Sequence, residues 1–486
     1  LMRDRWLRVS KTRLLAILTV LLGFFAAALA AAEAAPQAHS DPIAPVILGV
    51  TGLLFVALLG RFSARKLGLP SVLGELTIGI IAGNLAYSYG FDLILLLREG
   101  PHIFDTIQQF LHDATLGNEV CNTLVDARGR QVLSVLGGPS GNEYLQIAHT
   151  VDVFSRYGVI FLLFLVGLET NIEEMRKVGR DSLMVAFIGV ALPFLLGVAA
   201  TYLLASQVSF HTALFLGAAL GATSVGITVR VLEDLQQSHS RLAHTILGAA
   251  VFDDILGLLM LAAVTGIVVS GGIEVFHIAK VVLLALLFLG GAVFLGPFIL
   301  RFIIRLMRHL DLIEAKMFVS YLFVMVLAWF ANLSGLATII GAFTAGLILK
   351  DAYFVHWGPH EKHAYSIRDL IMPLEVILVP IFFVLMGIQV KLETFLDWQV
   401  VSLAAGLLVA AIAGKLACGL GASSGSNRWA IGLGMLPRGE VGLIFAAIGK
   451  GLGVVDDALF SSLVLVVIIT TLLSPPLLKI ALKNKT

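Results

Sequence analysis

The sequence has little charge for its size. Only 13% of its 486 residues are Asp, Glu, Lys or Arg, whereas 58% are hydrophobic. A water-soluble domain cannot bury so much apolar surface, which excludes soluble enzymes and soluble binding domains. The 33 basic and 32 acidic residues nearly cancel, so no excess of positive charge favours a nucleic-acid partner. The composition predicts a polytopic membrane protein.

Cysteine is nearly absent as well. Cys121 lies in a polar stretch and Cys418 in an apolar one. Two such isolated thiols exclude a disulfide framework and a cysteine-ligated metal site.

The N-terminus has the pattern of a targeting segment. A basic stretch is followed by a long apolar run and then by small residues. This pattern predicts a signal peptide over residues 1–35. The alternative is a retained transmembrane helix, because about 19 apolar residues are enough to span a bilayer. Both alternatives put residue 43 outside.

Beyond residue 40 the chain contains thirteen apolar segments, within a predicted transporter domain at 43–480. Lys and Arg are concentrated in alternate connections, which predicts that these connections and the C-terminus are cytoplasmic. The segments lie near residues 43–60, 70–90, 151–170, 182–205, 211–232, 241–270, 275–304, 316–333, 335–350, 370–390, 398–421, 429–450 and 457–480.

One connection is exceptionally long. Residues 91–150 are polar and mixed in charge, and the alternation of sides places them outside. A periplasmic cap, a partner-binding site and a dispensable insertion all remain open for this segment.

The chain contains an internal repeat. LPSVLGELTIGII resembles LATIIGAFTAGLI 267 residues later, with Gly79 matching Gly346. Gly167 matches Gly387 at an offset of 220, and SVGI matches EVGL at an offset of 216. The smaller later offsets are explained if the insertion at 91–150 is present only in the first half.

The repeat relates segments one to six to segments eight to thirteen. A displacement of seven segments is odd, so the two halves must be inverted in the membrane. Inverted repeats with discontinuous helices are an architecture of secondary transporters, whose substrate site lies near the midplane. We therefore expect two inverted six-helix repeats with crossed discontinuous helices.

Charged residues inside apolar segments are the strongest functional candidates, because they are costly to place in a membrane. Asp253 and Asp254 lie about 18 Å along their helix from its cytoplasmic end. Adjacent helical residues point about 100° apart, so the two carboxylates have different roles. Lys415 is the basic residue inside segment eleven; it either pairs with an aspartate or snorkels to the membrane surface.

Two helix-breaking sequences occupy equivalent places in the halves: GATSVGIT at 221–228 and MLPRGEVGL at 435–443. Unwound helices there could point free backbone groups at an ion. The hydroxyls of Thr223 and Ser224 could coordinate a cation or bond back to their own helix.

Three further charges have a simpler interpretation. Glu75, Arg438 and Glu440 lie inside segments two and twelve, where an Arg–Glu pair would join two helices. The sequence HWGPHEKH contains three histidines, but its proline and its cytoplasmic location favour solvated loop residues over a metal site. These histidines are His356, His360 and His363.

These motifs together resemble the cation:proton antiporter-2 family of monovalent cation/proton exchangers, over residues 45–480. The resemblance rests on eight sequences that occur in family order, among them GAAVFDDILGL, AGKLACGLGA and LPRGEVGLIF. It implies that Asp254 binds Na⁺, that Asp253 pairs with Lys415, and that Thr223 and Ser224 lie at the crossover, with Asp253 and Thr223 as further candidate ligands. The aspartate pair is similar to that of the electrogenic sodium/proton branch.

The resemblance also implies a homodimer in a bacterial inner membrane, no cofactor and no enzymatic activity. We therefore expect exchange of Na⁺ or Li⁺ for H⁺ by alternating access. The alternatives are a K⁺/H⁺ antiporter on the same fold and a Na⁺-coupled symporter of organic anions. An ion channel is disfavoured, because a deep acid pair binds too tightly for conduction.

Overall fold

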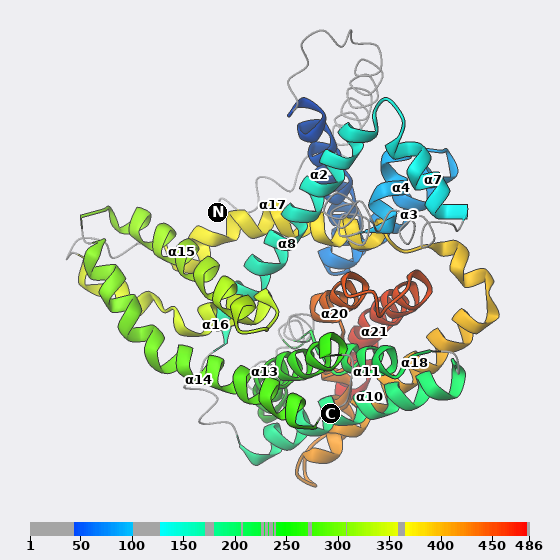
Figure 1. The fold of residues 1–486 in the computed structure, drawn as a ribbon. Helices are drawn as coiled ribbons and strands as arrows, with labels where there is room; N and C mark the ends of the chain where they lie inside the picture. Colours follow the sequence, from blue (N-terminus) through cyan, green and yellow to red (C-terminus); the bar gives the residue numbers. More distant parts are fainter. Residues whose placement is uncertain are drawn as a thin grey trace.

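The computed structural model describes residues 43–100, 127–170, 179–205, 208–224, 240–270, 275–307, 309–357 and 365–483, with single positions 228, 232 and 237. These residues form helices joined by short connections (Figure 1). The predicted signal peptide at 1–35 lies outside the described residues, as do 101–126 of the insertion, Cys121, and His360 and His363 of the histidine sequence.

The helices follow the predicted apolar segments. Nine of those described are long and apolar enough to cross a membrane, which confirms an all-helical polytopic protein. All the described helices of the first half, spanning or shorter, are α2 (Ala44–Lys66), α3 (Ser71–Ser88), α4 (Asp92–Glu99), α7 (Ala127–Leu136), α8 (Gly141–Glu169), α10 (Arg180–Leu204), α11 (Phe210–Ala219) and α13 (Arg241–Ser270). The remainder are α14 (Val275–Leu306), α15 (Leu312–Leu333), α16 (Thr338–Ile348), η4 (Asp351–Trp357), α17 (Ile367–Ile388), η5 (Leu392–Leu396), α18 (Trp398–Cys418), η6 (Gly419–Gly421), α19 (Arg428–Gly434), α20 (Glu440–Gly451) and α21 (Asp457–Lys483).

Two predicted spans are not continuous helices. The segment near 211–232 begins as α11, which ends at Ala219, and the segment near 429–450 is divided into α19 and α20. The full number of thirteen crossings therefore remains a prediction.

Both described ends of the predicted insertion are helical. Helix α4 buries Leu95, Leu96 and Leu97, and α8 begins at Gly141, ten residues before the predicted start of its segment. Ile147 and Ala148 extend the apolar face of α8 and are buried beside α4. These ends are therefore packed parts of the molecule.

The helices form two groups. The first group, called the scaffold bundle here, contains α2, α3, α8, α15, α16 and α17, and α4 packs on it. The second, called the crossover bundle, contains α10, α11, α13, α18, α19, α20 and α21. Among described residues the extensive helix packing occurs within each group, while α14 and η5 connect the two. In Figure 1 the scaffold bundle lies above and to the left, and the crossover bundle lies below.

The outer surface is apolar in the way that a bilayer requires. Helix α14 exposes Phe294, Phe298 and Phe302 by 71%, 61% and 68%. A soluble monomer rarely exposes a row of large aromatic side chains to water, whereas lipid tails solvate such side chains well.

Close glycine contacts reproduce the repeat. Gly79 on α3 lies against Gly387 on α17, and Gly346 on α16 lies against Gly167 on α8, each too close for a Cβ atom. The sequence repeat pairs Gly79 with Gly346 and Gly167 with Gly387. A two-fold axis that exchanges the halves converts one contact into the other. The packing therefore supports the predicted repeat.

Candidate functional site

The site is built where the two discontinuous helices meet. After α11 the chain is unwound through residues 220–224, and between α19 and α20 it is unwound through 435–439. The backbone N–H of Ser224 donates to the carbonyl oxygen of Pro437 at 2.8 Å, and its hydroxyl donates to Glu440 Oε2 at 2.9 Å. Ser224 and Glu440 are equivalent in the repeat, so their contact places the crossing on the axis between the halves.

Lys415 connects this crossing to the aspartates. Its side chain is fully buried on α18, so it does not snorkel. The ammonium donates to the Gly221 carbonyl oxygen and to Thr223 Oγ1, both at 2.6 Å, and to Asp253 Oδ1 at 3.1 Å. An ammonium has three donors, and these contacts use all of them. Thr223 in turn donates to the carbonyl oxygen of Met435 at 3.3 Å.

The two aspartates occupy different environments. Asp253 is 1% exposed, and its Oδ2 has no protein partner among the described residues. Asp254 retains exposed surface and makes no hydrogen bond or ion pair with the described chain, although Asp253, Glu440 and Lys415 are within electrostatic range of it. One carboxylate is therefore held by a lysine, and its neighbour is left without a protein cation of its own.

The predicted Arg–Glu pair does not form. Arg438 is buried, and its guanidinium donates to the carbonyl oxygens of Ala222 and Ala411, each at 3.4 Å. Glu75 instead pairs with Arg61 of α2 at 2.7 Å. The reason is that Glu75 belongs to the scaffold bundle, whereas Arg438 lies in the unwound crossover, where free carbonyl oxygens are nearer than any carboxylate of the described residues.

Sequence reasoning missed two carboxylates near the site. Glu375 on α17 is half-buried, and both Glu375 and Glu169 are within electrostatic range of Glu440. Glu169 ends α8 and pairs with Arg368 at 2.7 Å. These acids lead from the end predicted to be cytoplasmic towards Asp254. The signal was available, since Glu375 is a charged residue inside the predicted span 370–390.

This arrangement matches a known family. The family model described as "Sodium/hydrogen exchanger, transmembrane" matches residues 128–484. The chain belongs to this family. The family consists of transporters rather than enzymes, so the chain is a multi-pass cation/proton antiporter.

Curated exchangers of the family resemble the chain over most of its length. It is 34% identical over 447 residues to the "High-affinity Na(+)/H(+) antiporter NhaS3" of Synechocystis sp., which covers 90% of each chain. It is 32% identical over 362 residues to the "Na(+)/H(+)-K(+) antiporter GerN" of Bacillus cereus, covering 72% of this chain and 88% of the relative.

A solved structure of the family shares the fold. The sodium proton antiporter MjNhaP1 from Methanocaldococcus jannaschii at pH 8 matches with a TM-score of 0.55 and 17% identity. The match covers 90% of this chain and 96% of that one.

Proposed function

We propose that this exchanger moves Na⁺ or Li⁺ against H⁺ by alternating access, with Asp254 as the cation ligand. The observation that carries the proposal is the contrast within the aspartate pair. Asp253 contacts the ammonium of Lys415, whereas Asp254 has exposed surface and no partner in the described chain. A carboxylate without a protein cation, deep among apolar helices, is suited to hold a transported one.

Competition at Asp254 would couple the two fluxes. A carboxylate that holds a proton cannot also neutralise Na⁺, so each ion crosses only after the other has left. Hydroxyl and carbonyl oxygens, such as those of Thr223 and the unwound segments, are the ligand type that hard cations prefer. Asp253 is the further candidate ligand on the same helix.

Electrogenic exchange requires a second proton. With Asp254 alone, one proton replaces one Na⁺ and no net charge moves. If the cation also displaces Lys415 from Asp253, the freed ammonium can lose a proton, because burial opposes its charge. Two protons would then exchange for one Na⁺.

Two alternatives use the same scaffold. A K⁺/H⁺ antiporter is supported by the resemblance to GerN, whose name includes both Na⁺ and K⁺. A Na⁺-coupled organic-anion symporter needs a cationic site for the anion. The three N–H donors of the buried Lys415 all bond to protein oxygens, so this lysine has no donor left for an anion. The antiporter interpretation is therefore preferred. We also propose the homodimer and inner-membrane location that the family resemblance implies.

Proteoliposomes test the proposal directly. An imposed pH gradient should collapse on addition of Na⁺ or Li⁺ and much less on addition of K⁺, because a tight carboxylate site discriminates ions by size. Collapse by K⁺ alone would favour the K⁺/H⁺ alternative. A gradient that no monovalent cation dissipates would reject antiport.

A further inference from the structure

Six charged side chains gather at the end of the molecule predicted to face outside. The three cations, Arg98, Lys391 and Lys450, are exposed by only 1%, 2% and 4%. Three carboxylates balance their charge, those of Glu99, Glu393 and Asp457. This set is called the outer ion cluster below. Buried charges of this kind persist only when each is paired.

The pairs of the cluster are short. Arg98 Nη2 lies 2.7 Å from Glu393 Oε2, and Lys391 Nζ lies 2.6 Å from Glu99 Oε1. Arg98 also donates to the Asn84 side chain at 3.0 Å and lies over the ring of Tyr87. Helix α4, at the start of the long predicted insertion, thus supplies two of the six charges.

The cluster connects the two bundles. Lys391 follows α17 of the scaffold bundle, and its ammonium lies 2.5 Å from Oδ2 of Asp457, the first residue of α21 in the crossover bundle. Its backbone N–H donates to Ser461 Oγ of α21 at 3.1 Å. Lys450 of α20 donates to the carbonyl oxygen of Arg98 on α4 at 3.1 Å and pairs with Asp457 at 2.9 Å.

The two ends of the molecule differ in accessibility. Asp254 and Glu440 retain exposed surface, and the acids Glu375 and Glu169 lead from them towards the end predicted to be cytoplasmic. At the other end the three cations of the outer ion cluster are buried. Among the described residues, charged side chains therefore join the two bundles at the outer end of this conformation.

We propose that the outer ion cluster is a latch that holds the two bundles together on the outer side and must break for the site to open outward. The inference rests on the proposed alternating access. Breaking Lys391 from Asp457 and Lys450 from Arg98 separates the bundles without unwinding a helix. The latch thereby sets the balance between inward-open and outward-open states, and α4 makes the insertion part of that control.

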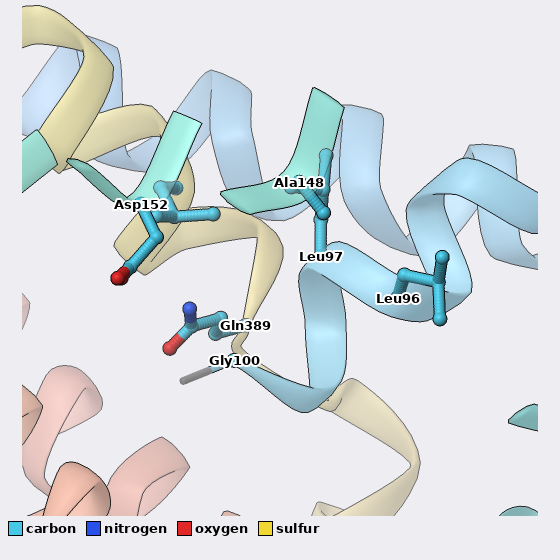
Figure 2. A pocket seen from close by; sticks show the side chains of 7 residues that line it. Leu96, Leu97, Gly100, Ala148, Asp152 and Gln389 are labelled. Carbon is cyan, nitrogen blue, oxygen red and sulfur yellow. The ribbon is translucent and has the colours of Figure 1, made fainter. Parts of the chain in front are cut away.

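The scaffold bundle is loosely packed beside the latch. Gln389, two residues before Lys391, is 1% exposed, and neither polar atom of its amide has a protein partner among the described residues. It lines a small cavity together with Asp152 and Gly100, and Figure 2 shows its amide reaching into the space near the Asp152 carboxylate. The latch therefore adjoins an incompletely packed part of the scaffold bundle, where α4, α8 and α17 meet.

Thiol labelling tests the latch without any ion flux. Ser461 is fully buried beside Lys391, so a Ser461→Cys reporter in a Cys121→Ser/Cys418→Ala background reports outward opening. In right-side-out vesicles, Asp457→Asn should raise the rate of reaction with a membrane-impermeant methanethiosulfonate about tenfold or more, as expected when a minor state becomes a major one.

The matched control is Arg61→Gln, which removes a 2.7 Å pair with the buried Glu75 inside the scaffold bundle. Its labelling rate should equal that of the reporter alone. An unchanged rate in Asp457→Asn, or an equal rise in Arg61→Gln, would overturn the latch. Because labelling is independent of transport, this result is separate from the success or failure of the exchange assay.

A covalent tie provides a second test. The 3.1 Å contact between the Lys391 backbone and Ser461 puts cysteines at these positions within reach of a disulfide. Oxidised Lys391→Cys/Ser461→Cys protein in the same cysteine-free background should show much less Na⁺-driven proton flux than the same protein after reduction. Full flux in protein shown by mass to be cross-linked would overturn the proposal.

Discussion

At the scale of single residues, the central feature is that oxygens of two different segments accept all three Lys415 donors. The Gly221 carbonyl and Thr223 hydroxyl belong to the unwound crossover, and Asp253 belongs to α13. One buried ammonium therefore joins α18, α13 and the crossover. Loss of its charge leaves the buried Asp253 carboxylate without a paired positive charge.

Lys415→Gln should destabilise the protein by about 3–5 kcal/mol, the usual effect of leaving a buried charge unpaired. Asp253→Asn in the same chain should recover part of that loss. A double-mutant cycle on melting temperature measures the coupling. Additive effects of the two substitutions would show that the 3.1 Å contact contributes nothing to stability.

Asp254→Asn should abolish exchange and leave the fold intact, because an amide keeps the shape of the carboxylate but cannot neutralise Na⁺ or carry a proton. Na⁺-driven proton flux in proteoliposomes measures the loss. Asp311→Asn is the control, since that exposed aspartate precedes α15 and makes no capping bond. Substantial flux through Asp254→Asn would remove this residue from the central role.

At the scale of helices, each half of the repeat contributes one helix to each of two close glycine contacts. The carbonyl oxygen of Phe164 occupies the position that a Cβ on Gly346 would need, so α8 and α16 can approach this closely only through glycine. The equivalent contact joins α3 and α17. The pair of contacts fixes how the two halves interlock within the scaffold bundle.

Gly346→Ala should therefore destabilise by about 1–3 kcal/mol, the cost of overpacking a close helix crossing. Gly290→Ala on α14 is the matched control, because a Cβ there meets nothing within 4 Å. That substitution should instead stabilise slightly, by up to about 1 kcal/mol of helix propensity. Thermal unfolding in detergent compares the two variants, and equal shifts would refute the close contact.

Much of this arrangement could be predicted from sequence. Apolar length located the helices, and the repeat offsets placed Ser224 and Glu440 at equivalent positions. Sequence could not show that these two equivalents touch, nor that Arg438 faces carbonyl oxygens rather than Glu75, since partner choice depends on which bundle each helix joins. The contact between Arg61 and Glu75 joins α2 and α3, and residue spacing alone does not reveal such a contact.

At the scale of the whole molecule, two bundles share few extensive helix contacts, and the ion site belongs to the crossover bundle alone. Movement of that bundle against the scaffold can therefore carry the site as a unit. In this account Na⁺ and protons share one carboxylate, and bundle movement exposes it to either side in turn.

The apparent Na⁺ affinity as a function of pH tests this account most directly. Lower pH should weaken it, because protons occupy the carboxylate that Na⁺ needs, by about tenfold per pH unit where one proton competes. Raising Na⁺ should restore the maximal rate of exchange at acid pH. The measurement is the half-saturating Na⁺ concentration for proton flux in proteoliposomes over the active pH range. A half-saturating concentration that is constant across that range would contradict competition at a shared site.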